Sequence, residues 1–213
     1  MKTELEVLLT AIDSSLAEAW HSICGDLPGV YIHEGDIFQT NSDAVVSPAN
    51  SFGFMDGGID AVYTRVFGQS VQRRLQTKIR ERHHGELLVG QAEIVATDHA
   101  TPFVIAAPTM RVPMILGETV NPYLAARAVF LLLLHGDLDD GSKIATKVRR
   151  VAFPGLATGV GRVAPKICAR QVRVAYEEVI LNQQHFPSTW FAAQERHQKL
   201  YRDAVVDLQY TTR

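Results

Sequence analysis

The sequence predicts a layered α/β domain, in which strands and helices alternate along most of the chain. Short apolar runs rich in β-branched residues indicate buried strands, and apolar residues three or four positions apart indicate helices. Two glycine-bearing loops each lie between such a strand and such a helix. Ligands of open α/β sheets bind at the carboxyl ends of strands, so the fold class also predicts where a site lies.

The first half of the chain supplies three strands and two helices. Apolar and β-branched runs predict strands at 6–12, 30–33 and 43–46. Asp13 or Ser14 supplies N-cap chemistry for a helix that ends near Gly25. Apolar residues at helical spacing predict a second helix from residue 59, which continues beyond a break at Gly68 to Ile79.

The second half continues the alternation. Similar runs predict strands at 90–97, 103–108 and 151–153, the middle one apolar throughout and therefore buried. Pro122 and Pro165 each suit the first turn of a helix, which predicts helices over 121–132 and 165–179. Residues 135–150 contain a polar loop and no recognisable motif.

Composition limits the class of protein. A chain of 213 residues can bury a full core, and one domain with an appendage is favoured over two independent domains. The net charge of -2 argues against a main role in nucleic-acid binding. Cys24 and Cys168 form no metal-ligand pattern, so no metal site is expected. No segment resembles a signal peptide or a membrane span, and a cytoplasmic protein without membrane association is expected.

The loop over residues 47–60 predicts an anion site. Its glycines would let backbone amides approach a ligand, and the helix beginning near Ile59 would turn its positive end towards it. Asn50 and Asp60 are polar where a plain turn does not need them, and both could face one pocket. The alternatives are a tight turn, a helix-terminal charge at Asp60 and a turn-capping amide at Asn50.

A second loop repeats this arrangement. Gly155, Thr158, Gly159 and Gly161 follow the strand at 151–153 and precede a helix. Two such loops could close on one diphosphate from both sides. Neither loop is a Walker P-loop, because the Gly-Lys-Ser/Thr ending is missing, and no GxGxxG follows a strand.

The composition changes near Gln183, which divides the chain into residues 1–182 and a C-terminal helical tail, residues 183–213. Ser188 can cap a helix in this tail. We expect its aromatic residues to pack onto the core, with a self-association surface or a lid as the alternative. The helix is expected to carry Trp190, Phe191, His197, Tyr201, Ala204 and Leu208.

Taken in order, these motifs resemble the macrodomain family. The matching segments are Gly35-Asp36-Ile37, residues 43–50, Gly57-Gly58-Ile59-Asp60, Gly90-Gln91-Ala92 and residues 154–161. The resemblance covers roughly residues 30 to 182. It implies a three-layer α/β/α fold with a mixed sheet, here with an N-terminal strand and helix added and a C-terminal helical extension.

The resemblance also implies roles for the site residues. ADP-ribose is the implied ligand or substrate, with no cofactor. Asp36 would accept a hydrogen bond from the adenine amino group, with Ile37 against the ring, whereas the residues alone indicate a turn or cap at Asp36. Asn50 would lie beside the distal ribose, and Asp60, ten residues later, would help to activate a water. The implied diphosphate-binding residues are Gly57, Gly58, Ile59, Ala157, Thr158, Gly159, Val160 and Gly161.

Three functions remain open at this point. Asn50 with Asp60 favours a metal-independent hydrolase acting on an ADP-ribosyl or O-acyl-ADP-ribose linkage. The altered loop around Met55 and Asp56 favours a reader of ADP-ribose or ADP-ribosylated protein without turnover. The basic helix from Arg73 to Arg82 could mark a nucleic-acid-binding module, although a solvated helix face explains it more simply. The sequence leaves the linkage and the oligomeric state undetermined.

Overall fold

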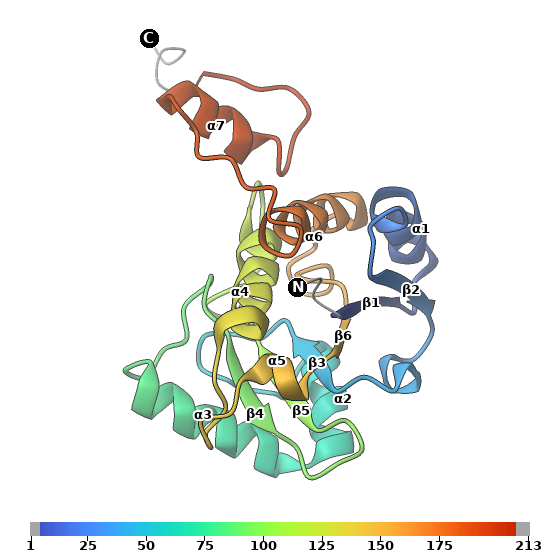
Figure 1. The fold of residues 1–213 in the computed structure, drawn as a ribbon, viewed down its shortest axis with the longest axis vertical. Helices are drawn as coiled ribbons and strands as arrows, with labels where there is room; N and C mark the ends of the chain where they lie inside the picture. The colour runs from blue at the N-terminus through green and yellow to red at the C-terminus, as the bar shows by residue number, and fades with distance from the viewer. Residues whose placement is uncertain (1–4, 208–213) are drawn as a thin grey trace.

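A computed structural model describes residues 5–207 and shows one six-stranded sheet with helices on both faces (Figure 1). The strands are β1 (Glu6–Ala11), β2 (Val30–Glu34), β3 (Ala44–Ser47), β4 (Glu93–Ala96), β5 (Phe103–Ala106) and β6 (Arg150–Phe153). The helices are α1 (Ser14–Cys24), the 3₁₀ helix η1 (Ile37–Thr40), α2 (Gly58–Phe67), α3 (Gln69–Arg82), α4 (Asn121–His135), α5 (Ile144–Lys147), α6 (Pro165–Val179) and α7 (Trp190–Gln198). The predicted three-layer α/β/α fold with a mixed sheet is confirmed.

The strand order in the sheet is β2-β1-β6-β3-β5-β4, so the last strand of the chain lies in the middle. Only β4 runs antiparallel, against β5. The other pairings are parallel, with β6 between β1 and β3 and with Ser47 of β3 opposite Ala106 of β5. The carboxyl ends of β3, β5 and β6 therefore meet at one edge of the sheet, as ligand sites in open α/β sheets require.

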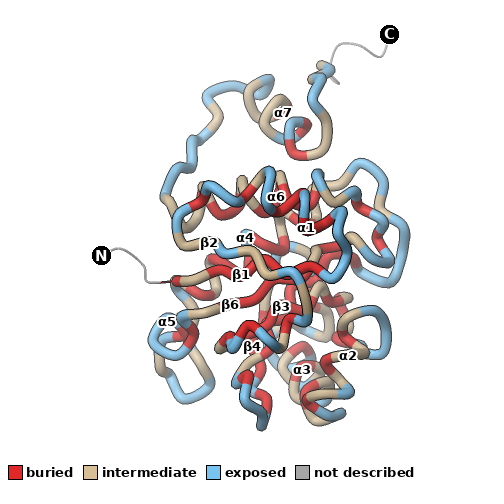
Figure 2. The backbone as a smooth tube through the Cα atoms, turned by 90° about the vertical axis from the view of Figure 1, so that its right-hand side faces the viewer, coloured by how far each residue is buried: buried red, intermediate tan, exposed pale blue. Residues whose placement is uncertain are grey.

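Each face of the sheet packs against its own layer of helices. Trp20, Phe130 and Phe153 are fully buried on the face covered by α1, α4 and α6. Tyr63 and Leu75 are fully buried on the face covered by α2 and α3. Figure 2 shows the buried segments concentrated in the sheet and on the inner sides of both layers. Between residues 5 and 207, no helix has both the length and the apolar character needed to cross a membrane.

Local signals for helix ends are largely confirmed. The Asp13 side chain accepts a hydrogen bond from the Leu16 amide at 3.1 Å and so caps α1. Gly68 separates α2 from α3 with a φ of 79°, a backbone conformation that favours glycine. The polar loop predicted within residues 135–150 follows α4, and the short helix α5, which the sequence did not predict, comes after it.

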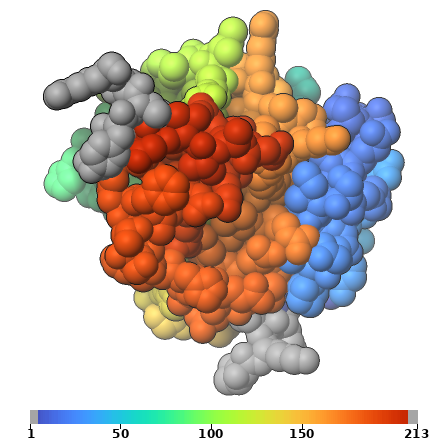
Figure 3. Space-filling model, turned by 90° about the horizontal axis from the view of Figure 1, so that it is seen from above, coloured from blue at the N-terminus to red at the C-terminus, as the bar shows by residue number. Residues whose placement is uncertain are grey.

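The prediction for the tail aromatics is wrong. Trp190 and Phe191 are 66% and 52% exposed, and the buried residues of α7 are Gln194 and Gln198. Polar contacts with α6 hold the tail instead: the Arg170 side chain donates to Asp203 Oδ1 at 2.7 Å, and the Gln171 side chain donates to Leu200 O at 3.3 Å. In Figure 3 the tail lies over the α6 side of the molecule. The cap of α7 is Thr189 rather than Ser188, the predicted Leu208 lies outside the described residues, and the division at residue 182 stays a prediction.

We predict that Phe130→Ala destabilises the protein by about 3–5 kcal/mol, the usual cost of removing a buried phenylalanine. Phe130 is fully buried, with its ring 5.2 Å from that of Phe153 and 5.6 Å from that of Tyr176. Phe186→Ala is the matched control, because Phe186 is 96% exposed and its loss should change stability little. Urea unfolding of both variants measures the difference, and similar losses would contradict this account of the core.

Candidate functional site

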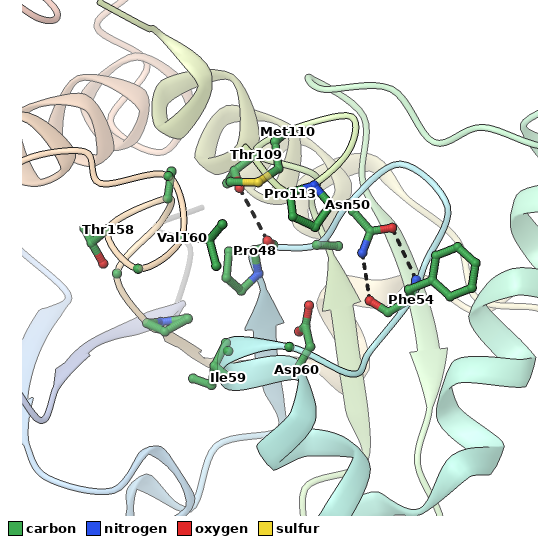
Figure 4. Close-up of a pocket in the computed structure, with 18 of the residues that line it drawn as sticks. Pro48, Asn50, Phe54, Ile59, Asp60, Thr109, Met110, Pro113, Thr158 and Val160 are labelled. Atoms are coloured by element: carbon green, nitrogen blue, oxygen red, sulfur yellow. Dashed lines mark hydrogen bonds between the residues drawn. The ribbon is translucent and has the colours of Figure 1, made fainter. Parts of the chain in front are cut away.

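A pocket of about 280 Å³ lies at the edge where β3, β5 and β6 end (Figure 4). Its walls come from the three loops that follow these strands. The loop after β3 supplies Pro48, Ala49, Asn50, Phe54, Asp56, Gly57, Gly58, Ile59 and Asp60. The loop after β5 supplies Thr109, Met110 and Pro113, and the loop after β6 supplies Pro154, Gly155, Ala157, Thr158, Gly159, Val160 and Gly161. The structure thus brings Asn50, Asp60 and both predicted glycine loops into one cavity.

The wall contributed by the loop after β5 was missed by sequence reasoning. Backbone pairing continues past the ends of β3 and β5: the Thr109 amide donates to Ala49 O at 3.1 Å, and the Ser51 amide donates to Arg111 O at 3.1 Å. The Thr109 hydroxyl also donates to Pro48 O at 3.4 Å (Figure 4). The sequence did hold one signal for this wall, the apolar run predicted as the buried strand β5. The carboxyl end of a strand parallel to β3 lies at the same edge of the sheet as that of β3.

Asn50 lines the pocket and also folds its own loop. Its side-chain oxygen accepts hydrogen bonds from the amides of Phe52 and Phe54 at 3.1 and 3.3 Å. Its side-chain nitrogen donates to Phe54 O at 2.8 Å, and Figure 4 shows the amide turned towards this segment. Asn50 therefore caps the turn, which was one of the alternatives that the sequence left open. An amide nitrogen carries two hydrogens, so Asn50 can cap the turn and still donate to a ligand.

The beginning of the first glycine loop is fixed by α2 and α3. The Met55 amide donates to the Gln72 side chain at 2.8 Å, and the Thr64 hydroxyl donates to Met55 O at 2.6 Å. Met55 is buried and does not line the pocket. The Met55 amide is therefore used within the protein, and the amides that remain for a ligand include those of Gly57, Gly58 and Ile59, at the start of α2.

Close packing shapes the second glycine loop. A Cβ atom on Gly155 would collide with the Thr158 hydroxyl and would lie 2.7 Å from a methyl carbon of Leu16. The Leu116 amide donates to Gly161 O at 2.9 Å and joins this loop to the segment that follows β5. Gly159 has open space at its Cβ position, so a side chain there would extend away from the protein's own atoms.

Asp60 is the buried carboxyl group of the pocket. It lies in the first turn of α2 and is 7% exposed, and its Oδ1 accepts a hydrogen bond from the Ser47 hydroxyl at 2.6 Å. The pKa of Asp60 is raised from 3.8 to about 6. Burial is the largest cause, the Ser47 hydroxyl opposes it, and the Asp56 carboxylate adds to it. Figure 4 shows the Asp60 carboxyl pointing into the cavity. Ser47 was not among the predicted site residues.

The pocket holds carboxylates but no basic side chain. Among the described residues that line it, Asp56 and Asp60 are the charged ones, and none is lysine or arginine. An anion would therefore have to be held by backbone amides and by the positive end of α2, whose first N–H groups have no acceptor within the helix. Asp56 is exposed, so water screens its charge. Arg162, the basic residue that directly follows the second glycine loop, does not line the pocket.

Asp36 and Ile37 are not among the residues that line this pocket. Asp36 caps η1, where its Oδ1 accepts a hydrogen bond from the Phe38 amide at 3.0 Å. Ile37 is 5% exposed and packs in the core beneath the sheet. The cap expected from the residues alone is present, and adenine recognition by these two residues stays a prediction.

Comparison with known proteins agrees with the fold. A family model described as Macro domain matches residues 46–172, more than half of the chain. The chain belongs to the Macro domain family. An uncharacterized protein of Aquifex aeolicus is 32% identical over 143 residues, which cover 66% of this chain and 76% of that protein. An uncharacterized protein of Aeropyrum pernix is 29% identical over 143 residues, covering 66% and 67%.

Solved macrodomains share the fold. The macrodomain of Mycobacterium tuberculosis DarG has a TM-score of 0.55 and 17% identity, with 68% of this chain and 88% of that chain covered. The Oceanobacillus iheyensis macrodomain with ADP has a TM-score of 0.56 and 18% identity, with 78% and 84% covered. At these identities the likeness shows the fold alone.

We predict that Asp60 makes the stability of this macrodomain depend on pH. The folded protein binds the Asp60 proton more tightly than the unfolded chain, because its pKa is about 6 rather than 3.8. The resulting stabilisation is present below about pH 4 and is lost as the pH rises through 6. Relative to Asp60→Asn, the wild-type protein should lose up to about 3 kcal/mol of unfolding free energy between pH 4 and 7.

Urea unfolding of both proteins at several pH values measures this difference. Other titrating groups are common to the two proteins and largely cancel in the difference. A difference in unfolding free energy that does not change with pH would contradict the raised pKa of Asp60.

Proposed function

We propose that this macrodomain binds ADP-ribose or a derivative in the three-loop pocket and hydrolyses a bond at the distal ribose. The observation that carries the proposal is Asp60, a buried carboxyl group that faces a cavity walled by two glycine loops. Family membership supports the choice of ligand, since the Oceanobacillus iheyensis macrodomain has been solved with ADP and a variant of it with ADPR. The substrates would be ADP-ribosylated protein or O-acyl-ADP-ribose.

The diphosphate would lie between the two glycine loops. Amides of residues 57–59 sit at the positive end of α2, and amides of residues 157–161 form the facing wall. Together these amides and the helix terminus would bind the anion in place of basic side chains, which the described pocket lining does not contain. Asp36 would accept a hydrogen bond from the adenine amino group through Oδ2, because Oδ1 caps η1. Ile37 would lie against the adenine ring.

The distal ribose would then lie between Asn50 and Asp60. The Asp60 carboxylate would accept a proton from a water as the water oxygen forms its bond to the substrate. The water oxygen would bond to a carbon of the distal ribose, the bond from that carbon to the carboxyl oxygen of the acyl group or modified side chain would break, and that group would leave as a carboxylate with the bonding electrons. Asn50 would fix the sugar through its second amide hydrogen. A carboxyl group with a pKa of about 6 is suited to general-base catalysis near neutral pH, because it is mostly ionised there and still basic enough to accept a proton.

The structure weakens the nucleic-acid alternative. Three of the five basic residues of α3 are paired with acidic partners rather than left for phosphates. Arg74 pairs with Asp98 at 2.5 Å, and Lys78 and Arg82 both pair with Asp139, at 2.8 and 2.7 Å. A nucleic acid would have to displace these partners, so the face from Arg73 to Arg82 offers much less binding charge than the sequence alone suggests.

We predict that Gly159→Val weakens ADP-ribose binding by tenfold or more. Nothing in the protein lies within 4 Å of the Cβ position of Gly159, so the added side chain would leave the fold intact and occupy the pocket. Gly117→Val is the matched control, since Gly117 also has open space but does not line the pocket. Calorimetric titration with ADP-ribose measures both. Wild-type protein that binds no ADP-ribose would contradict the proposal.

We predict that Asp60→Asn lowers turnover at least a hundredfold, the usual contribution of a general base, and changes ADP-ribose affinity only a few-fold. Release of ADP-ribose from ADP-ribosylated protein and hydrolysis of O-acetyl-ADP-ribose are the two assays. Equal turnover by wild type and variant would refute the role of Asp60. Binding without turnover by the wild-type protein would leave the reader function in place of the hydrolase.

A further inference from the structure

A side chain outside the pocket wall holds the carboxyl group inside it. Ser47 is the last residue of β3 and is fully buried, and its hydroxyl donates to Asp60 Oδ1 at 2.6 Å across thirteen positions of the chain. This distance is typical of a hydrogen bond to an ionised acceptor. The contact ties the end of a central strand to the first turn of α2.

Among the described residues, Ser47 is the one side chain that donates a hydrogen bond to Asp60. Asp60 makes no ion pair with any described residue, and the Ser47 hydroxyl is the one hydrogen-bond donor recorded for it there. The charged group that acts on Asp60 electrostatically is Asp56, in the preceding loop, and Asp60 in turn raises the pKa of Tyr63, one turn further along α2. The Tyr63 hydroxyl donates to Val46 O at 3.0 Å and so is directed elsewhere.

We propose that Ser47 is a positioning residue, whose hydroxyl holds Oδ1 of Asp60 so that the second carboxylate oxygen is presented to the pocket. Part of the supporting evidence is electrostatic. Burial and Asp56 both favour the neutral form of Asp60, and the Ser47 hydroxyl is what opposes them. Without it, Asp60 would turn more freely and would be protonated over more of the range near neutral pH. The catalytic consequence rests on the proposed function, but the positioning does not.

The test is a carbon-13 NMR titration of the Asp60 carboxyl in free protein, between pH 4 and 8.5, with the resonance assigned by its loss in Asp60→Asn. The midpoint should rise by about one pH unit in Ser47→Ala, because a hydrogen bond to a charged group is lost. Ser47→Thr, which keeps the hydroxyl, should restore the wild-type midpoint. If Ser47→Ala does not fold, Ser47→Cys keeps the volume with a weaker donor and should raise the midpoint in the same direction.

Ser42→Ala is the matched control. Ser42 is also a buried serine, but it precedes β3 and bonds with Thr40, at the end of the strand away from the pocket. Its loss should leave the Asp60 midpoint unchanged. Superimposable titrations of wild type and Ser47→Ala, or an equal shift in Ser42→Ala, would overturn the proposal.

Turnover gives a second readout that separates this proposal from the proposed function. In Ser47→Ala, the acid limb of the kcat profile should move up with the NMR midpoint, while KM changes less than about twofold, since the hydroxyl does not line the pocket. A shifted midpoint in a wild-type protein without turnover would refute the hydrolase and uphold the positioning. Turnover by the wild-type protein, with an unshifted midpoint and an unshifted acid limb in Ser47→Ala, would uphold the hydrolase and refute the positioning role of Ser47.

Discussion

The position of β6 between β1 and β3 is the constraint on which the site depends. Parallel pairing there places the end of the last strand beside the ends of β3 and β5, although these strands lie far apart in the sequence. Helices on both faces leave this edge as the place where three loops meet. The pocket is therefore a consequence of strand order, and the loops only have to supply its chemistry.

That chemistry is unusual in its charge. The lining has two carboxylates and, within the described part of the chain, no basic side chain, yet it joins two loops suited to a diphosphate. Binding must then come from fixed amides and a helix terminus, which cost little reorganisation when an anion arrives. The buried Asp60 is compatible with this arrangement because Ser47 donates to one of its oxygens. The same burial that destabilises its charge gives it a basicity useful near neutral pH.

Much of this was accessible from the sequence. The periodicity predicted the layers, and the glycine loops around Asn50 and Asp60 predicted both the edge and the residues of one cavity, because local signals and fold agree there. Thr109 was missed because it carries no motif and reaches the pocket only through pairing beyond the strand ends. Ser47 was missed because its role is a contact between distant segments. The burial of Trp190 was predicted wrongly, because the helical spacing of aromatic residues does not reveal that α7 docks through polar contacts such as the ion pair of Arg196 with Glu178.

A crystal structure of the Asp60→Asn variant with ADP-ribose would test the central claim most directly. The account predicts the diphosphate between residues 57–59 and 157–161, held by backbone amides, with the distal ribose against Asn50 and residue 60. It also predicts that the hydroxyl of Ser47 stays in hydrogen-bond contact with residue 60. A ligand bound outside the three loops, or a diphosphate held by basic side chains instead of amides, would contradict the account.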